Sequence, residues 1–265
     1  MTLKRSVALL LGAALLLGAA GLYWLLQPPC GTIVLAYHSI KDEPFSESEH
    51  LFVTPAELED QVRWLKRFGY EFLFADEFRV EPGKKLVCIT FDDGYQDNLT
   101  EAMPILQRNG AKGTVFVATK NIGLNEYCLS EDDIRALGQC PCVHVGSHPD
   151  GHYLATNLSD EDFEKQLALS KRRLEKLTGA PCLSFAYPGG YYDEQKASLA
   201  KKYYDYSFTY PGTVWAAGAH SDAAALPRIT VNRGTSGLKL LLMIRRAEQD
   251  PCHPSTAAAQ QAALK

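Results

Sequence analysis

The regular alternation of strand-like and helix-like segments after Gly31 most constrains the fold of this chain. Short apolar runs rich in β-branched residues are typical of buried strands. Amphipathic segments separate them, and Thr54-Pro-Ala-Glu57 shows how one begins, with an N-cap Thr, a Pro in the first turn and a Glu three residues after the cap. Strands that alternate with helices form parallel sheets. About seven or eight such units over residues 31–250 predict an α/β fold, a distorted (β/α) barrel of about seven or eight parallel strands.

The positions of the expected elements follow from these patterns. Strands are expected at 32–37, 71–74, 86–91, 113–118, 143–147, 183–187, 207–210 and 228–231, and helices at 54–68, 98–108, 159–178 and 195–202. In a barrel of parallel strands, functional residues lie where the strands end. His38, the pair Asp92 and Asp93, and His148 each lie at such an end. We therefore expect these side chains to gather on one face of the barrel.

The first residues have the composition of a targeting segment. Lys4 and Arg5 precede an apolar run over residues 7–26, and about 20 apolar residues suffice to span a bilayer as a helix. The positive end of such a helix faces the cytoplasm. We expect a cytoplasmic stub over 1–6, a transmembrane signal-anchor over 7–26, the membrane as a partner and the body outside the cytoplasmic membrane. A cleaved signal peptide, which would give a secreted protein, is the alternative.

Charge and composition exclude one class of partner. The net charge is −4 and the pI is near 6.0, and no basic stripe is interleaved with aromatic residues, so we expect no nucleic acid partner. The last residues, 251–265, are rich in Ala and Gln. We expect them to form a disordered tail.

Two adjacent carboxylates, Asp92 and Asp93, follow the apolar strand over 86–91. Successive side chains of an extended chain point to opposite sides. Such a pair is therefore expected to do two different jobs, one holding a metal and the other facing a substrate. A solvated turn is the alternative for the Asp-Asp-Gly sequence taken alone.

Three histidines, His144, His148 and His152, are spaced four residues apart. The glycines and the proline between them exclude a helix, so a strand followed by a turn is expected. Two imidazoles and one aspartate, with the other positions open, form a common catalytic zinc site. By residue type alone the carboxylate could come from Asp92 or Asp93.

Three motifs in order, Thr-Phe-Asp-Asp-Gly, His-x-x-x-His and Phe-x-x-Pro-x-Gly, resemble those of the polysaccharide deacetylases with a NodB homology domain (carbohydrate esterase family four). The resemblance covers about residues 32–231. The segments AYHSI, ELEDQVRWLKRFGYEF and FAYPGG are most similar to the branch that removes N-acetyl groups from poly-β-1,6-N-acetylglucosamine. The resemblance implies a hydrolase that acts on an acetylated glycan with a divalent metal. Zn²⁺ is the first expectation, and Co²⁺, Ni²⁺ or Fe²⁺ are alternatives.

The resemblance also implies roles for single residues. Asp92 matches the catalytic base, and the metal ligands are Asp93, His148 and His152. The segment matching the substrate and oxyanion site is Tyr187, Pro188, Gly189 and Gly190, and the Gly189 N–H is the expected oxyanion donor.

The sequence departs from the family pattern at three places. Pro149 replaces a Ser or Thr, and Ala186 replaces an arginine that pairs with the base, for which Arg228 is a candidate substitute. Many family members carry a histidine general acid after a Leu-x-Ile strand, but the corresponding stretch here, Leu226–Arg233, contains no histidine, which leaves His38, favoured by its position, or His220 as the general acid. A non-catalytic carbohydrate-binding relative and an O-acetyl ester deacetylase remain alternative functions.

Overall fold

The structure is a computed structural model that describes residues 2–27, 29, 31–43, 51–210, 216–218 and 221–247. Its α-helices are α1 (Thr2–Leu26), α2 (Pro55–Arg67), α3 (Met103–Asn109), α4 (Glu131–Gly138), α5 (Asp160–Thr178), α6 (Glu194–Ala200) and α7 (Gly237–Ala247). Its strands are β1 (Ile33–Tyr37), β2 (Ser39–Ile40), β3 (Phe52–Val53), β4 (Glu71–Leu73), β5 (Leu86–Phe91), β6 (Gly113–Ala118), β7 (Val143–His148), β8 (Ser184–Ala186), β9 (Tyr206–Thr209), β10 (Leu226–Pro227) and β11 (Ile229–Thr230). The predicted alternation of strands and helices is confirmed.

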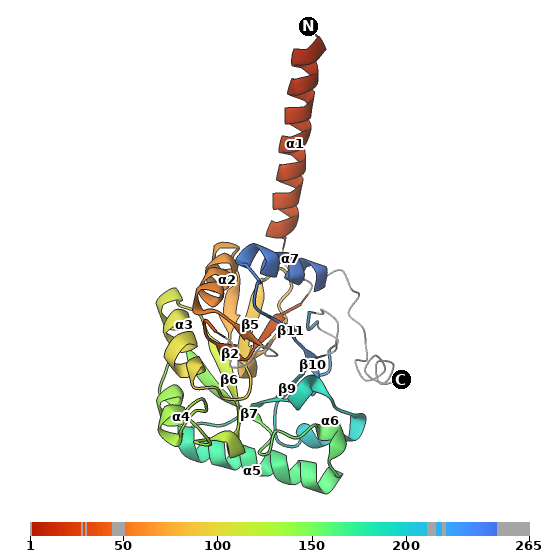
Figure 1. The fold of residues 1–265 in the computed structure, drawn as a ribbon. Coiled ribbons are helices and arrows are strands. Elements are labelled where there is room, and N and C mark those ends of the chain that lie inside the picture. Colours follow the sequence, from red (N-terminus) through yellow and green to blue (C-terminus); the bar gives the residue numbers. More distant parts are fainter. Residues whose placement is uncertain are drawn as a thin grey trace.

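The main sheet is almost closed on itself (Figure 1). Its strands follow one another in the order β10, β9, β8, β7, β6, β5, β1 and β11, with β4 added beside β5, and every pair is parallel. At one edge β10 pairs with β9, and at the other β11 pairs with β1. Only Arg228 separates β10 from β11 in the sequence. One short stretch of chain therefore joins both edges, which gives the nearly closed barrel of eight parallel strands.

The side chains of the strands alternate between the inside of the barrel and the helix layer outside it. A small apolar cluster fills the inside and takes its strand members from alternate positions: Val34, Leu73, Leu86, Cys88, Phe116, Ala186, Phe208 and Leu226. Counting on from these positions in steps of two leads to His38, Asp92, Tyr210 and Arg228. Gly146 also faces inward, because a Cβ there would lie 2.4 Å from the Phe116 ring, and His148 is two residues later. The inward positions at the C-terminal end of the barrel are therefore polar.

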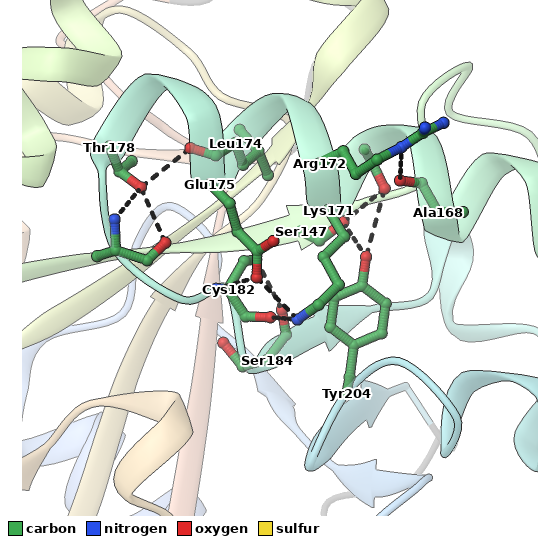
Figure 2. A network of polar contacts seen from close by, with 12 residues as sticks. Ser147, Ala168, Lys171, Arg172, Leu174, Glu175, Thr178, Cys182, Ser184 and Tyr204 are labelled. Atoms are coloured by element: carbon green, nitrogen blue, oxygen red, sulfur yellow. Dashed lines mark hydrogen bonds and ion pairs between the residues drawn. The ribbon is translucent and has the colours of Figure 1, made fainter.

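The outward-facing side of β7 is held by polar contacts with α5 (Figure 2). The hydroxyl oxygens of Ser147 and Ser170 are 2.8 Å apart, and the Tyr204 hydroxyl donates to the Ser147 oxygen at 2.9 Å. All three side chains are buried. Because Ser147 is fixed outward on this network, its neighbour His148 is directed into the mouth of the barrel.

The predicted N-terminal caps of two helices are present, but two other helices were not predicted. Thr54 caps α2 in a reciprocal capping box with Glu57, and Ser159 caps α5. However, α4 and α7 lie where the sequence analysis expected connecting chain. The start of α4 carries a clear signal, because Ser130 and Asp133 form a second capping box. The helix was missed because it has only eight residues, too short for its apolar period to be distinct.

The segment over residues 7–26 lies within α1, which projects from the body in Figure 1. Two contacts join the end of α1 to the body: Lys85 Nζ donates to the Leu25 carbonyl at 3.3 Å, and Arg245 Nη1 of α7 donates to the carbonyl of Gln27, just after the helix, at 3.5 Å. Among the helices of the described residues, none is long and apolar enough to cross a membrane. The predicted transmembrane signal-anchor is therefore not confirmed. The predicted tail, 251–265, and His220 lie outside the described residues.

Candidate active site

Three potential metal ligands meet at the mouth of the barrel. Asp93 Oδ1 lies 2.8 Å from His152 Nε2 and 3.5 Å from His148 Nε2, and the ligand atoms of the three residues are all within 4.8 Å of one another. Asp93 and His152 both have positive φ angles, 73° and 54°, a conformation that non-glycine residues rarely adopt and that is often found at functional sites. The local backbone is thus bent to bring these two side chains together.

The orientation of His148 fits a bound cation. Its Nδ1 lies 2.6 Å from the Ala186 carbonyl oxygen, which can only accept a hydrogen bond, so Nδ1 carries the proton. The other ring nitrogen of His148, Nε2, faces the Asp93 carboxylate at 3.5 Å. Such a carbonyl behind a histidine is the usual support of a metal ligand, so these residues fit a divalent metal.

A tight turn places His152 although the hydroxyl expected at position 149 is absent. The His152 N–H donates to the Pro149 carbonyl at 3.1 Å, which closes the turn. Asp150 anchors it to the neighbouring loop, because its carboxylate accepts from the Thr119 hydroxyl at 2.5 Å and its carbonyl accepts from the Lys120 N–H at 2.8 Å. The rigid proline and the contacts of Asp150 therefore support the turn.

Asp92 lies inside the barrel with a different set of partners. Its two carboxylate oxygens each accept from one guanidinium nitrogen of Arg228 at 2.7 Å, and Oδ2 also accepts from the Tyr210 hydroxyl at 2.8 Å. Burial raises the pKa of the Asp92 carboxyl, but the charge and hydrogen bonds of Arg228 outweigh burial, so the pKa lies below its ordinary value. Asp92 is therefore an ionised carboxylate at neutral pH.

The two adjacent aspartates thus have separate partners, as the sequence analysis expected. The reason differs from the one given there. β5 ends at Phe91, and Asp93 has a positive φ, so the pair is not a continuation of the extended strand. Burial raises the pKa of the Asp93 carboxyl, but the hydrogen bonds of His148 and His152 outweigh it and hold the pKa well below its ordinary value.

Arg228 takes the place of the arginine that is missing at Ala186. Besides Asp92 it donates to the Thr90 hydroxyl at 3.1 Å, and its guanidinium lies 4.4 Å from the centre of the Tyr210 ring. The side chain is fully buried. The sequence analysis named Arg228 only as a candidate partner of Asp92 and did not identify Tyr210 as a second partner. Tyr210 could have been found, because it ends the predicted strand 207–210 at a position that faces the inside of the barrel.

His38 lies close to this group and is almost fully buried. Its ring is nearly parallel to that of Tyr210, with centres 6.3 Å apart. Burial lowers the pKa of the His38 imidazole, and the charges of Asp92 and Asp93 only partly oppose this effect. His38 is therefore neutral at neutral pH.

The segment expected to contact substrate divides into two parts. Tyr187 is fully buried and its hydroxyl donates to the Ala224 carbonyl at 3.0 Å, so this side chain points away from the site. Pro188 is also buried, whereas Gly189 is exposed and has a φ of 60°. At Gly190 a Cβ atom would lie 2.3 Å from the Tyr210 backbone nitrogen. Glycine there allows the close approach that positions Tyr210.

His144 is not part of the cluster. Its Nδ1 lies 2.9 Å from Asp76 Oδ1, and its ring stacks on Phe74 with centres 3.5 Å apart. It is the second residue of β7, whereas His148 is the last. The two histidines are an even number of residues apart on one strand and so share a face, but they lie at opposite ends of it.

Comparison with known proteins gives the family. A family model described as polysaccharide deacetylase matches residues 79–206. The protein YxkH of Bacillus subtilis (strain 168), whose name places it among polysaccharide deacetylases, is 32% identical over 219 residues, which cover 80% of this chain and 75% of that protein. The chain belongs to the polysaccharide deacetylase family. It is accordingly a hydrolase of the class that acts on carbon–nitrogen bonds.

Two further relatives extend this result. The poly-beta-1,6-N-acetyl-D-glucosamine N-deacetylase of Staphylococcus aureus (strain MRSA252) is 24% identical over 198 residues, which cover 64% of this chain and 68% of that protein. The solved structure of the Streptococcus pyogenes deacetylase PplD in complex with acetate has a TM-score of 0.73 and 26% identity, and the match covers 82% of this chain and 99% of that one. The family resemblance identified from the motifs is confirmed.

Proposed function

We propose that this polysaccharide deacetylase removes N-acetyl groups from an N-acetylglucosamine-containing polysaccharide and uses a divalent metal held by Asp93, His148 and His152. The observation that carries the proposal is the meeting of these three ligands beside Asp92, a buried carboxylate that Arg228 keeps ionised. The name of the staphylococcal relative supports a poly-N-acetylglucosamine substrate. One carboxylate and two imidazoles leave open coordination positions, which suits Zn²⁺.

Each residue then has a definite task. A bound divalent ion would supply Lewis-acid chemistry, which polarises the acetyl carbonyl and lowers the pKa of water. Asp92 accepts the proton of the attacking water, and Arg228 and Tyr210 keep its carboxylate in place. The exposed Gly189 N–H donates to the oxyanion that develops on the acetyl carbonyl. The products are acetate and a free sugar amine.

We further propose that the reaction takes place outside the cytoplasmic membrane. The basic residues before the apolar segment 7–26 support this location. The proposal does not depend on a membrane-spanning helix, and fractionation of cells that produce the full chain would test it. Retention of the protein in the cytoplasmic fraction would contradict it.

Acetate release by the purified full chain tests the function. The panel contains poly-N-acetylglucosamine, chitooligosaccharide, peptidoglycan and acetylated xylan, each after removal of metal and after addition of zinc. The proposal predicts zinc-dependent release from N-acetylated polymers. Release from acetylated xylan alone would indicate an O-acetyl esterase, and binding of glycans without release would indicate a non-catalytic relative.

A further inference from the structure

Two cysteine side chains face each other in the turn that leads from α4 into β7. The sulfur atoms of Cys140 and Cys142 are 2.9 Å apart, close enough for one thiol to donate a weak hydrogen bond to the other. Both are free thiols in the structure. The sulfur atoms of a disulfide are about 2.0 Å apart, so a movement of about 1 Å would join this pair. The two thiols are therefore placed to form a disulfide without rearrangement of the fold.

The backbone of this turn holds the two cysteines in place. The Val143 N–H donates to the Cys140 carbonyl at 3.3 Å, which closes a turn of four residues with Pro141 at its second position. The ring of this proline fixes the φ angle there. The Cys140 N–H also donates to a carbonyl in the last turn of α4 at 3.0 Å, and the Gly113 N–H donates to the Cys142 carbonyl at 3.0 Å. None of these bonds uses a sulfur atom, so a disulfide would leave them in place.

The two thiols differ in their access to solvent. Cys142 is buried, and burial and the neighbouring Cys140 raise the pKa of its thiol to about 12. Cys140 is only partly buried, and it lines a cavity of about 220 Å³ together with Asp76, His144 and Thr178. A thiol must be accessible and must lose its proton in order to react with a disulfide. Cys140 is therefore the thiol of this pair that reacts first.

The pair lies at the opposite end of β7 from the candidate active site. Cys142 directly precedes this strand, and His148 is its last residue. The six residues of the strand span about 20 Å, so the thiols are remote from the proposed metal ligands. A disulfide here would close a loop of only three residues, 140–142, which constrains the unfolded chain little and adds little stability. The position of the pair thus suits a reversible reaction better than a structural cross-link.

We propose that Cys140 and Cys142 form a redox site, which is oxidised to a disulfide and reduced again in the folded protein by exchange with small thiols and disulfides. The Cys140 thiolate attacks one sulfur of a small disulfide such as oxidised glutathione, and the other half leaves and takes up a proton in place of the one that Cys140 lost. Cys142 then attacks the Cys140 sulfur, breaks the mixed disulfide and gives its proton to the second leaving thiolate. Two electrons pass from the protein to the small disulfide, which becomes two thiols. This inference is independent of the proposed deacetylation.

The test treats the folded full chain with oxidised glutathione, blocks the remaining thiols and digests the protein with trypsin without reduction. Cleavage after Arg135 and Lys165 releases a peptide, 136–165, whose only cysteines are Cys140 and Cys142. In the wild type this peptide should carry no blocking group and should be lighter by about 2 Da, the mass of the two hydrogens lost on oxidation. Dithiothreitol should restore both thiols without a denaturant.

Two cysteine variants and a matched control complete the test. Cys142→Ser should stop at the mixed disulfide between Cys140 and glutathione, and Cys140→Ser should form no disulfide within the peptide. Cys128→Ser should behave as the wild type, because Cys128 is also partly buried but lies in the loop after β6. Two blocked thiols or a retained glutathione in the wild-type peptide would overturn the proposal, even where a variant does not fold. A disulfide that dithiothreitol reduces only in urea would overturn it too.

Discussion

The guanidinium of Arg228 and the carboxylate of Asp92 form a two-pronged ion pair inside the barrel, with both N–O distances at 2.7 Å. Arg228 is also the one residue between β10 and β11, which are the two edge strands of the sheet. The stretch of chain that nearly closes the barrel thus also supplies the group that orients the proposed base. Fold closure and site chemistry depend on the same residue.

Replacement of Arg228 should therefore affect both stability and activity. In Arg228→Leu the Asp92 carboxylate is left buried without its partner, and loss of one member of a buried pair costs about 3–5 kcal/mol in the free energy of unfolding. Arg228→Lys keeps the charge but not the two-pronged geometry, so its loss should be smaller. Urea denaturation and acetate release measure the two effects, and both variants should release less acetate than the wild type.

Arg108 offers a matched control for this pair. It contacts Glu59 through two nitrogens at 3.0 and 2.6 Å, but its side chain is 49% exposed. Exposed pairs contribute at most about 1 kcal/mol, so Arg108→Leu should reduce stability only slightly. Equal losses for the two arginine variants would show that burial of the Asp92 pair has no special effect.

Metal content should separate the two aspartates. Asp92→Asn should retain zinc and lose about 100-fold or more in kcat, as expected for removal of a general base. Asp93→Asn, His148→Ala and His152→Ala should lose zinc, measured by elemental analysis, together with activity. His144→Ala is the control that keeps zinc, because its partner is Asp76. Zinc loss in Asp92→Asn with retention in Asp93→Asn would exchange the two roles.

Gly190 and Gly179 provide a pair that tests the placement of Tyr210. Both have positive φ angles, 74° and 71°, but only at Gly190 would a Cβ atom collide with backbone, 2.3 Å from the Tyr210 nitrogen. Gly179→Ala should cost about 1–2 kcal/mol for the left-handed conformation alone. Gly190→Ala should cost more and also reduce turnover, because Tyr210 must move away from Asp92. Unimpaired turnover in a folded Gly190→Ala protein would mean that this contact does not position the base.

The ends of the predicted strands indicated which residues reach the mouth of the barrel, because functional residues of a parallel barrel lie where its strands end. Asp92 and His148 were placed correctly for this reason. The strand pattern could not reveal that the Tyr187 hydroxyl donates to the Ala224 carbonyl, since that contact depends on a segment 37 residues away. The ion pair between Arg228 and Asp92 joins residues 136 positions apart, so it forms only when the barrel closes.

Single-residue conformations were also beyond a reading of the sequence. Asp93 and His152 adopt positive φ, which neither residue type favours strongly. Tertiary contacts override these local preferences. The family resemblance therefore named the three residues that meet in the candidate metal site, but the sequence did not reveal the backbone geometry that brings them together.

His38 should make the stability of the protein depend on pH. Burial lowers the pKa of its imidazole in the folded state, whereas the unfolded chain has the ordinary value of about 6.5. Between these two values the unfolded state binds more protons, so the free energy of unfolding falls as the pH is lowered through this window. His38→Ala should reduce this dependence, measured by urea denaturation across pH 4–8. An identical pH dependence in the variant would contradict the lowered pKa.

The lowered pKa of His38 also sets a condition on its role as the general acid. An acid must carry its proton before the reaction, so activity that depends on protonated His38 should fall as the pH rises through its lowered pKa, below about 6.5. His38→Ala should then retain zinc, lose turnover and lack this alkaline limb in the profile of kcat/KM. If wild-type activity instead stays constant up to about pH 8, a neutral His38 cannot be the donor, and Asp92 returns the proton it took from water. Loss of turnover in His220→Ala but not in His38→Ala would move the role to His220.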